Sequence, residues 1–235
     1  MIKNNEIPNV KLTASQILRD FSMDLYGLRT DEMVFIAGRG FTISNEQITW
    51  NDNQLDLWND SVSILDKNYF RSDIGTVDAS EWGVKNPMVK EGTAFVLTGL
   101  TKLTLGLHRG LEAFIQVGDV RVRRDTNRNG IWEESQIHLA SGINLHAAYT
   151  IRSKNKIEIV GSNSLGCTVP KLLWQDPIWI QHYVQRAKNT KQKFFYRLYV
   201  DGRELALYIG AKYAPVENKN FANILYEERQ RNKIA

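Results

Sequence analysis

Short β-rich runs separated by turn residues dominate the chain between residues 92 and 200. Seven of these runs are expected to be strands: 94–97, 101–107, 113–117, 120–124, 142–146, 157–160 and 194–200. Gly, Asn and Asp punctuate them, and many short strands joined in this way are typical of antiparallel sheets. The sequence therefore predicts a mainly β (α+β) fold.

Residues 13–29 have the apolar spacing of an amphipathic helix. The stripe consists of three residues spaced by four: Ile17, Phe21 and Leu25. Thr13 or Ser15 precedes it and supplies the hydroxyl that helix N-termini prefer. We therefore expect a packing helix within an N-terminal extension that spans residues 1–60.

A second helix is expected after the single cysteine. Pro170 suits the first turn of a helix, because its missing N–H needs no partner there, and the apolar pattern continues to about Lys188. Pro177 lies inside this segment and predicts a kink or two short helices. A further strand is expected over 33–37, and residues 44–92 are expected to be loops with fragments of strand.

Length and composition limit the class of protein. The 235 residues are 43% hydrophobic and 24% charged, which excludes a wholly disordered, collagen-like or coiled-coil chain. The longest apolar-leaning stretch, 95–107, is interrupted by Thr and Lys and is too short to span a bilayer. We expect no membrane span, a main domain over 61–212 and a basic tail over 213–235.

Charge is divided unevenly along the chain. Residues 1–150 carry 15 Lys and Arg against 19 Asp and Glu, whereas residues 151–235 carry 15 against 7. A basic C-terminal part suggests an anionic partner, such as a cell-wall polymer, an anionic lipid or a nucleic acid. A solvated basic surface without a partner explains the same numbers equally well.

The segment that begins at Asp125 resembles the start of a calcium loop. Asp125, Asn127 and Asn129 alternate as oxygen ligands would, but Gln136 stands where the closing Glu is needed. Asn129-Gly130 is also a hairpin signal, because both residues tolerate positive φ. The sequence favours a turn over a calcium site, and no cofactor is expected.

Cys167 is the one cysteine of the chain and cannot form an internal disulfide. It lies in a small-residue turn ahead of the expected helix, whose dipole would favour the thiolate. Gly166 would let the backbone approach a substrate, and neighbouring N–H groups could hold an oxyanion. His146 ends a predicted strand and would be the base that a nucleophilic Cys needs. A buried, inert thiol is the alternative.

The remaining histidines carry weaker signals. His108 lies at the end of a predicted strand, in Gly-Leu-His-Arg-Gly, where a structural role is the simpler interpretation. His138 and His182 are expected to be structural.

The spacing of His146 and Cys167 resembles the signature of the L,D-transpeptidase (YkuD-like) catalytic domain. That signature is a His, a spacer of about the 17 residues found here, and Ser/Thr-His-Gly-Cys, which is Ser164-Leu-Gly-Cys167 in this chain. The resemblance is to a divergent branch that typically reads Gly-Ile-Asn-Ile-His and Ser-Ala-Gly-Cys-Gln, and it covers about residues 90–202 in consistent order. The matching stretches are Gly106-Leu-His-Arg-Gly, Val122-Arg-Arg-Asp-Thr-Asn-Arg-Asn-Gly, Gly142-Ile-Asn-Leu-His, Val160-Gly-Ser-Asn-Ser-Leu-Gly-Cys and Phe194-Phe-Tyr-Arg-Leu.

The family implies a β-sandwich-like catalytic domain with one helix after the cysteine. Its Cys thiolate attacks an amide of a peptidoglycan stem peptide next to a D-centre, and the acyl-enzyme then passes to an amine or to water. By position, Cys167 would be the nucleophile and His146 its general base. The carbonyl of Ala147 would orient the imidazole, and the N–H groups of Gly166 and Cys167 would form the oxyanion hole.

The resemblance places three further residues near the substrate. Ser164 would shape the turn, and His108 and Asn144 belong to matching stretches. Two positions depart from the family: Leu165 replaces the His before Gly-Cys, as in the divergent branch, and Val169 replaces the usual Asn or Arg. Thr168 also stands where the branch has Gln. Because of these two differences, at 168 and 169, the resemblance does not identify the substrate.

The leading hypothesis is therefore a peptidoglycan-acting cysteine peptidase of the phage lysis (endolysin) type. Such an enzyme would cause bacteriolysis by cutting stem or cross-bridge peptides. The N-terminus lacks a secretory signal, so we expect synthesis in the cytoplasm and action at the cell wall after release by a holin-like partner.

Two alternatives remain, an L,D-transpeptidase or carboxypeptidase that modifies the wall and a non-catalytic virion or wall-binding protein. Nucleic acid is an unlikely partner, because the aromatic residues around Tyr196 alternate as core residues of a strand do. If His146 acts as the base, activity should fall on acidification through the histidine range.

Overall fold

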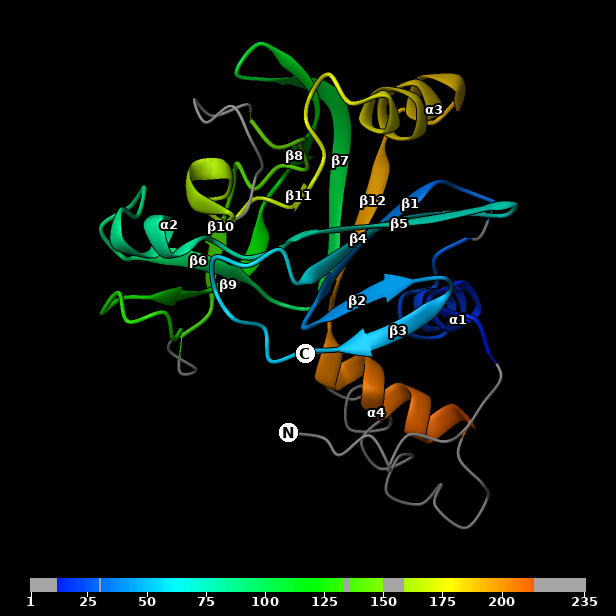
Figure 1. Cartoon of the computed structure of the whole chain (residues 1–235), viewed down its shortest axis with the longest axis horizontal. Helices are drawn as coiled ribbons and strands as arrows, with labels where there is room; N and C mark the ends of the chain where they lie inside the picture. The colour runs from blue at the N-terminus through cyan, green and yellow to red at the C-terminus, as the bar shows by residue number, and fades with distance from the viewer. Residues whose placement is uncertain (1–11, 30, 133–135, 150–158, 214–235) are drawn as a thin grey trace.

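A seven-stranded sheet forms the centre of the computed structural model, which describes residues 12–29, 31–132, 136–149 and 159–213 (Figure 1). Its strands are, in spatial order, β11 (Val169–Pro170), β5 (Tyr69–Thr76), β4 (Asp60–Asp66), β1 (Val34–Arg39), β12 (Phe195–Asp201), β7 (Gly99–His108) and β8 (Leu111–Val117). All neighbouring strands are antiparallel except β1 and β12, which run parallel. The predicted mainly β fold is confirmed.

Two smaller sheets complete the β structure. One has the order β10 (His138–Ala140), β9 (Val120–Asp125) and β6 (Thr93–Val96), and the other is the hairpin of β2 (Phe41–Ser44) and β3 (Gln47–Trp50). Five of the seven predicted runs are thus strands, at β6, β7, β8, β9 and β12. The strand predicted over 142–146 is wrong, since that segment forms only isolated bridges. Residues 157 and 158 of the run 157–160 lie outside the described residues, and Ile159 and Val160 are not in a strand.

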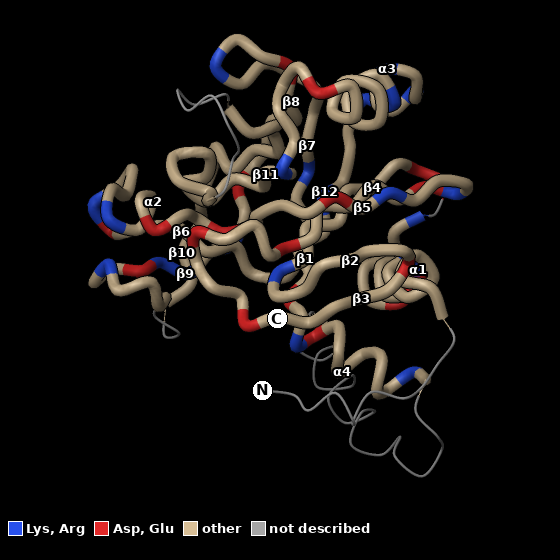
Figure 2. Tube along the Cα trace, viewed as in Figure 1, with Lys and Arg blue, Asp and Glu red and all other residues tan. Residues whose placement is uncertain are grey.

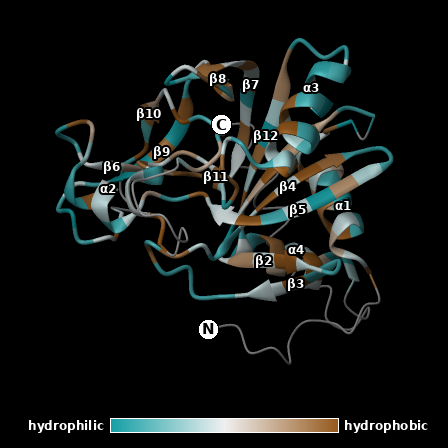
Figure 3. Ribbon diagram, turned by 45° about the horizontal axis from the view of Figure 1, so that its top comes forward, coloured by the Kyte–Doolittle hydropathy of each residue, from teal (hydrophilic) through white to brown (hydrophobic). Residues whose placement is uncertain are grey.

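Two helices cover one face of the large sheet. Helix α1 (Ala14–Tyr26) begins after Thr13, whose hydroxyl accepts from the N–H of Gln16 in a capping box. The predicted stripe packs against α4 (Gly202–Tyr213), where the rings of Phe21 and Tyr208 meet edge to face at 5.1 Å. Helix α4 was not anticipated from the sequence. Figure 3 shows hydrophobic residues concentrated on α4 and on β4, with hydrophilic residues on the peripheral loops.

The opposite face is covered by the helical segment that follows the cysteine. It comprises η3 (Trp179–Gln185), which has π-helical hydrogen bonds, and α3 (Arg186–Asn189). Trp179 and Tyr183 are buried against phenylalanines of β1, β8 and β12. The prediction that this helix opens at Pro170 is wrong, because Pro170 lies in β11 and the first helical residue is Pro177, after the capping carboxylate of Asp176.

Strand β4 shows why residues 44–92 were difficult to predict. Asp60, Ser61 and Ser63 are buried although they are polar. The carboxylate of Asp60 accepts the backbone N–H groups of Gly40 and Val77, so its burial is compensated by hydrogen bonds. Because β1 lies between β4 and β12, the sheet contains strands from both sides of the boundary expected at residue 60.

Cations of the C-terminal part pair with acids of the N-terminal part. Four pairs join these segments: Arg186 with Asp66, Lys188 with Glu112, and Lys212 with both Asp20 and Asp24. Figure 2 shows positive and negative residues interspersed over the described elements. Three cations of the C-terminal part are therefore paired with acids within the fold. No helix among the described residues is long and apolar enough to cross a membrane.

The loop after β9 is a turn held by its own side chains, as expected. The Asp125 carboxylate accepts the N–H groups of Asn129 and Gly130, and the side chain of Asn129 accepts the N–H of Ile131. In the described part of the chain, no three His, Cys, Asp or Glu side chains gather as a metal site.

Candidate active site

Two chain segments that are distant in sequence, those that carry His146 and Cys167, lie side by side. Leu145 and Thr168 form a parallel bridge, in which the N–H of Thr168 donates to Asn144 and the N–H of His146 donates to Thr168. Leu145 also exchanges two hydrogen bonds of 2.9 Å with Phe114 of β8. The pair of segments is therefore fixed to the edge of the large sheet.

The hydrogen bond of His146 determines which ring nitrogen is free. Its Nδ1 lies 2.8 Å from the carbonyl oxygen of Ala147, which can only accept, so Nδ1 carries the proton. The Nε2 atom is then left with a lone pair that can accept a proton. This is the arrangement that the resemblance implied for Ala147, and it suits a general base.

A stack of rings encloses the imidazole. His108 lies over one face of His146 at 4.6 Å between centroids, and Trp174 lies parallel to it at 5.9 Å. Tyr149 lies tilted at 5.4 Å, with the guanidinium of Arg109 over its ring. His146 is only 2% exposed as a result.

Burial of the ring lowers the pKa of His146 to about 3. The bond to Ala147 acts in the opposite direction, and the charges of His108, Arg109 and Arg197 add to the lowering. At neutral pH the site therefore holds a neutral imidazole. If His146 acts as a base, a fall in activity is therefore expected only below the ordinary histidine range.

We expect the imidazole of His146 to remain neutral between pH 8 and pH 5. Two-dimensional ¹H–¹⁵N spectra of the histidine rings would show one ring with constant nitrogen shifts over this range, assigned through its loss in His146→Gln. A ring assigned to His146 that titrates near pH 6.5 would contradict the enclosed geometry.

The same burial couples folding to pH. The unfolded chain binds a proton at His146 below about pH 6.5, whereas the folded chain does so only near pH 3, so stability from this group is lost as pH falls through that window. Between pH 7 and pH 5 we expect the wild type to lose about 2 kcal/mol relative to His146→Gln. Urea unfolding of both proteins at the two pH values measures this difference, and equal losses would contradict it.

Cys167 is only partly buried. Its Sγ lies 3.8 Å from the carbonyl oxygen of Gly142, and burial raises the pKa of the thiol. The N–H of Asn144 and the cations Arg197 and Arg109 act to lower it. The expectation that a helix dipole activates this cysteine is wrong, because β11 follows it and the helix starts only at Pro177.

Ser164 shapes the cysteine turn, as the resemblance implied. Its hydroxyl lies 2.8 Å from the carbonyl oxygens of both Asp78 and Cys167, and it accepts the N–H of Gly166 at 3.1 Å. Gly166 has φ +118°, and a Cβ there would approach the carbonyl oxygen of Ala94 at 3.1 Å. The N–H of Gly166 is thus already bonded, so it would have to leave Ser164 to act in an oxyanion hole.

Asn144 and His108 are coupled rather than free to bind a substrate. The side-chain oxygen of Asn144 accepts the N–H of Gln116, so its amide nitrogen donates to Nδ1 of His108 at 3.0 Å. Asn144 is buried, and its place is that of a positioning residue for the ring stacked on His146. The other two histidines lie elsewhere, His138 on β10 and His182 against Tyr69.

Arg197 is a residue of this site that the sequence analysis did not identify. It lies on β12, where its alternation with apolar neighbours gives it the pattern of a core position. Its guanidinium donates to the hydroxyl of Thr168, which follows Cys167. It also donates to the carbonyl of Ile143, which follows Gly142, the residue that the thiol contacts. Only its place in the stretch that resembles the family could have drawn attention to it.

No family model, no curated protein and no solved structure matches this chain.

Proposed function

We propose that the protein is a cysteine enzyme that cleaves amide bonds through an acyl-enzyme on Cys167. The observation that carries this proposal is the tautomer of His146. Its Nδ1–H is held by Ala147, which leaves the basic Nε2 on a segment paired with that of the cysteine. The same pairing of residues is the one that the resemblance to L,D-transpeptidases assigns to catalysis.

The reaction would begin from a neutral thiol and a neutral imidazole. Nε2 of His146 takes the thiol proton while Sγ of Cys167 attacks the carbonyl carbon, which forms a carbon–sulfur bond and a tetrahedral oxyanion. The oxyanion collapses, the carbon–nitrogen bond breaks, and the imidazolium returns the proton to the leaving amine. Water then attacks the thioester with the help of His146, which releases the acid and restores the thiol.

The substrate class follows from the resemblance. We propose peptidoglycan stem or cross-bridge peptides as substrates, with hydrolysis by an endolysin-like peptidase as the leading reaction. An L,D-transpeptidase-like fold is part of this proposal, and the mainly β architecture supports its coarser form. An amine in place of water at the second step would make the protein a transferase with the same site.

Digestion of purified peptidoglycan by the wild type and by Cys167→Ala tests the proposal. Mass spectrometry of the soluble products should show new muropeptides with the wild type alone, and their masses identify the bond. Crosslinked or amino-acid-exchanged products would instead identify a transferase. Products that are equal with both folded proteins would contradict a cysteine mechanism.

One observation favours a non-catalytic binding protein as the second candidate. Burial raises the pKa of Cys167, which is typical of structural rather than reactive thiols. In that case neither protein would release fragments, while both would sediment equally with insoluble peptidoglycan.

A further inference from the structure

Arg197 is a fully buried cation that lacks a carboxylate partner within the described residues. Its relative exposure is 0%. The acids whose charges act on its guanidinium are the phenol of Tyr199 and the thiol of Cys167, both of which are neutral when protonated. Burying an uncompensated charge is costly, so such a group is retained where it has a function.

The other buried arginine of the sheet shows the usual solution. Arg39 lies on β1, next to β12, and its guanidinium donates to both carboxylate oxygens of Asp78. Arg197 makes only neutral contacts instead. Its Nη2 lies 2.6 Å from the carbonyl of Ile143 and its Nη1 lies 3.2 Å from the hydroxyl of Thr168, while Nε is buried without a partner.

These contacts place the guanidinium close enough to the thiol for their charges to interact. Thr168 follows Cys167, and Ile143 follows Gly142, whose carbonyl receives the thiol hydrogen. The plane of Arg197 also lies over the ring of Tyr199 at 4.5 Å, and Tyr199 accepts from the hydroxyl of Thr168. The guanidinium is thereby held by the two segments that carry Ile143 and Thr168, and it is shielded from solvent.

We propose that Arg197 is the positioning residue that stabilises the Cys167 thiolate as the thiol loses its proton. The neutral, enclosed His146 is a weak base, so the proton transfer needs an anion that is stabilised as it forms. A fixed cation in a site of low dielectric supplies that stabilisation without reorganisation. The inference deepens the proposed function, because it explains how this nucleophile is activated without a helix dipole.

Other groups that face the thiol do not replace Arg197. Arg109 stands on the β7–β8 turn and is exposed, so water screens its charge. His146 and His108 have lowered pKa values and are neutral at pH 7, and burial raises the pKa of both Tyr149 and Tyr199. Among the described residues, Arg197 is thus the buried cation whose charge acts on the Cys167 thiol.

The pH dependence of Cys167 alkylation tests the proposal without any peptidoglycan. For folded Arg197→Met, the rate with iodoacetamide at pH 7 should fall about tenfold or more, because loss of the cation raises the thiol pKa by about one unit or more. Arg197→Lys should recover most of the rate. Tyr199→Phe is the matched control, since it removes a hydrogen bond of the same cluster without its charge, and it should react as the wild type does.

An unchanged pH profile in folded Arg197→Met would overturn the proposal, and so would an equal loss in Tyr199→Phe. A second pair keeps the test valid if Arg197→Met does not fold. Cys167→Asp places a carboxylate near the guanidinium, so it should melt at a higher temperature at pH 7 than the nearly isosteric Cys167→Asn. A lower melting temperature for Cys167→Asp would contradict a cation at this place. Neither readout requires that the protein act on peptidoglycan.

Discussion

Replacing His146 by glutamine is expected to lower the rate of muropeptide release by at least about a hundredfold while the chain remains folded. Glutamine can still donate to the carbonyl of Ala147, but it has no basic atom in place of Nε2. The thiol proton then has no acceptor during attack on the substrate. The measurement is the initial rate of soluble muropeptide release, with circular dichroism as the check on folding.

His182→Gln is the matched control for this variant. His182 lies on η3, with its Nδ1 2.7 Å from the hydroxyl of Tyr69, and glutamine can preserve a bond there. Its rate should equal that of the wild type. The wild-type rate should also stay nearly constant between pH 8 and pH 5, since His146 remains neutral there. Full activity in His146→Gln would remove the imidazole from the mechanism.

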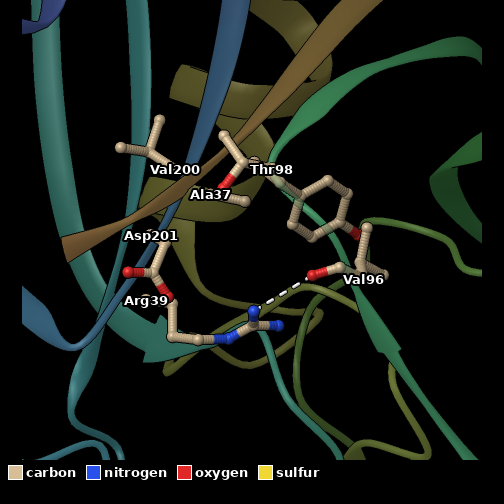
Figure 4. A pocket seen from close by; sticks show the side chains of 7 residues that line it. Ala37, Arg39, Val96, Thr98, Val200 and Asp201 are labelled. Atoms are coloured by element: carbon tan, nitrogen blue, oxygen red, sulfur yellow. Dashed lines mark hydrogen bonds between the residues drawn. The ribbon is translucent and has the colours of Figure 1, made fainter. Parts of the chain in front are cut away.

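Replacing Arg39 by methionine should have the largest effect on stability. The Arg39 guanidinium bonds Asp78 through Nε at 3.0 and 2.9 Å. It also donates to the carbonyl of Val96 at 3.0 Å (Figure 4). Asp60 lies close enough that burial and the charge of Asp78 raise its pKa to about 7. Without the cation, Asp78 would be left buried and unpaired, and we expect a loss of about 3–5 kcal/mol in the free energy of unfolding.

Urea unfolding at pH 7.5 measures this loss. The matched control is Arg29→Met, which breaks the exposed pair with Asp31 and should leave stability unchanged. Adding Asp78→Asn to Arg39→Met should restore part of the loss, because the variant then lacks the unpaired charge. A loss no larger than that of Arg29→Met would contradict the buried ion pair.

One contact of the candidate site could be predicted from the sequence. The resemblance implied the bond between the imidazole of His146 and the carbonyl of Ala147, which depends only on neighbouring residues. The expected thiolate-stabilising helix was wrong, since Pro170 satisfies a strand edge as well as a first helical turn. A local pattern cannot distinguish these two places for a proline.

Long-range contacts account for what remained hidden. Strand β4 is buried between β1 and β5, although its residues Asp60, Ser61 and Ser63 are polar. Because this burial depends on contacts with other strands, the polar residues of β4 resembled a loop. The alternation around Arg197 predicted a core strand correctly. It could not show that this cation would be buried without a carboxylate, because that depends on which residues of 142–168 contact it.

The most direct test of the central claim is the mass of the intact protein after incubation with purified peptidoglycan fragments and rapid acid quenching. We predict a transient increase equal to the acyl part of the substrate, located at Cys167 by peptide mapping and absent from Cys167→Ala. Cleavage of the fragments by Cys167→Ala, or turnover by the wild type without an adduct at any time, would contradict an acyl-enzyme on Cys167.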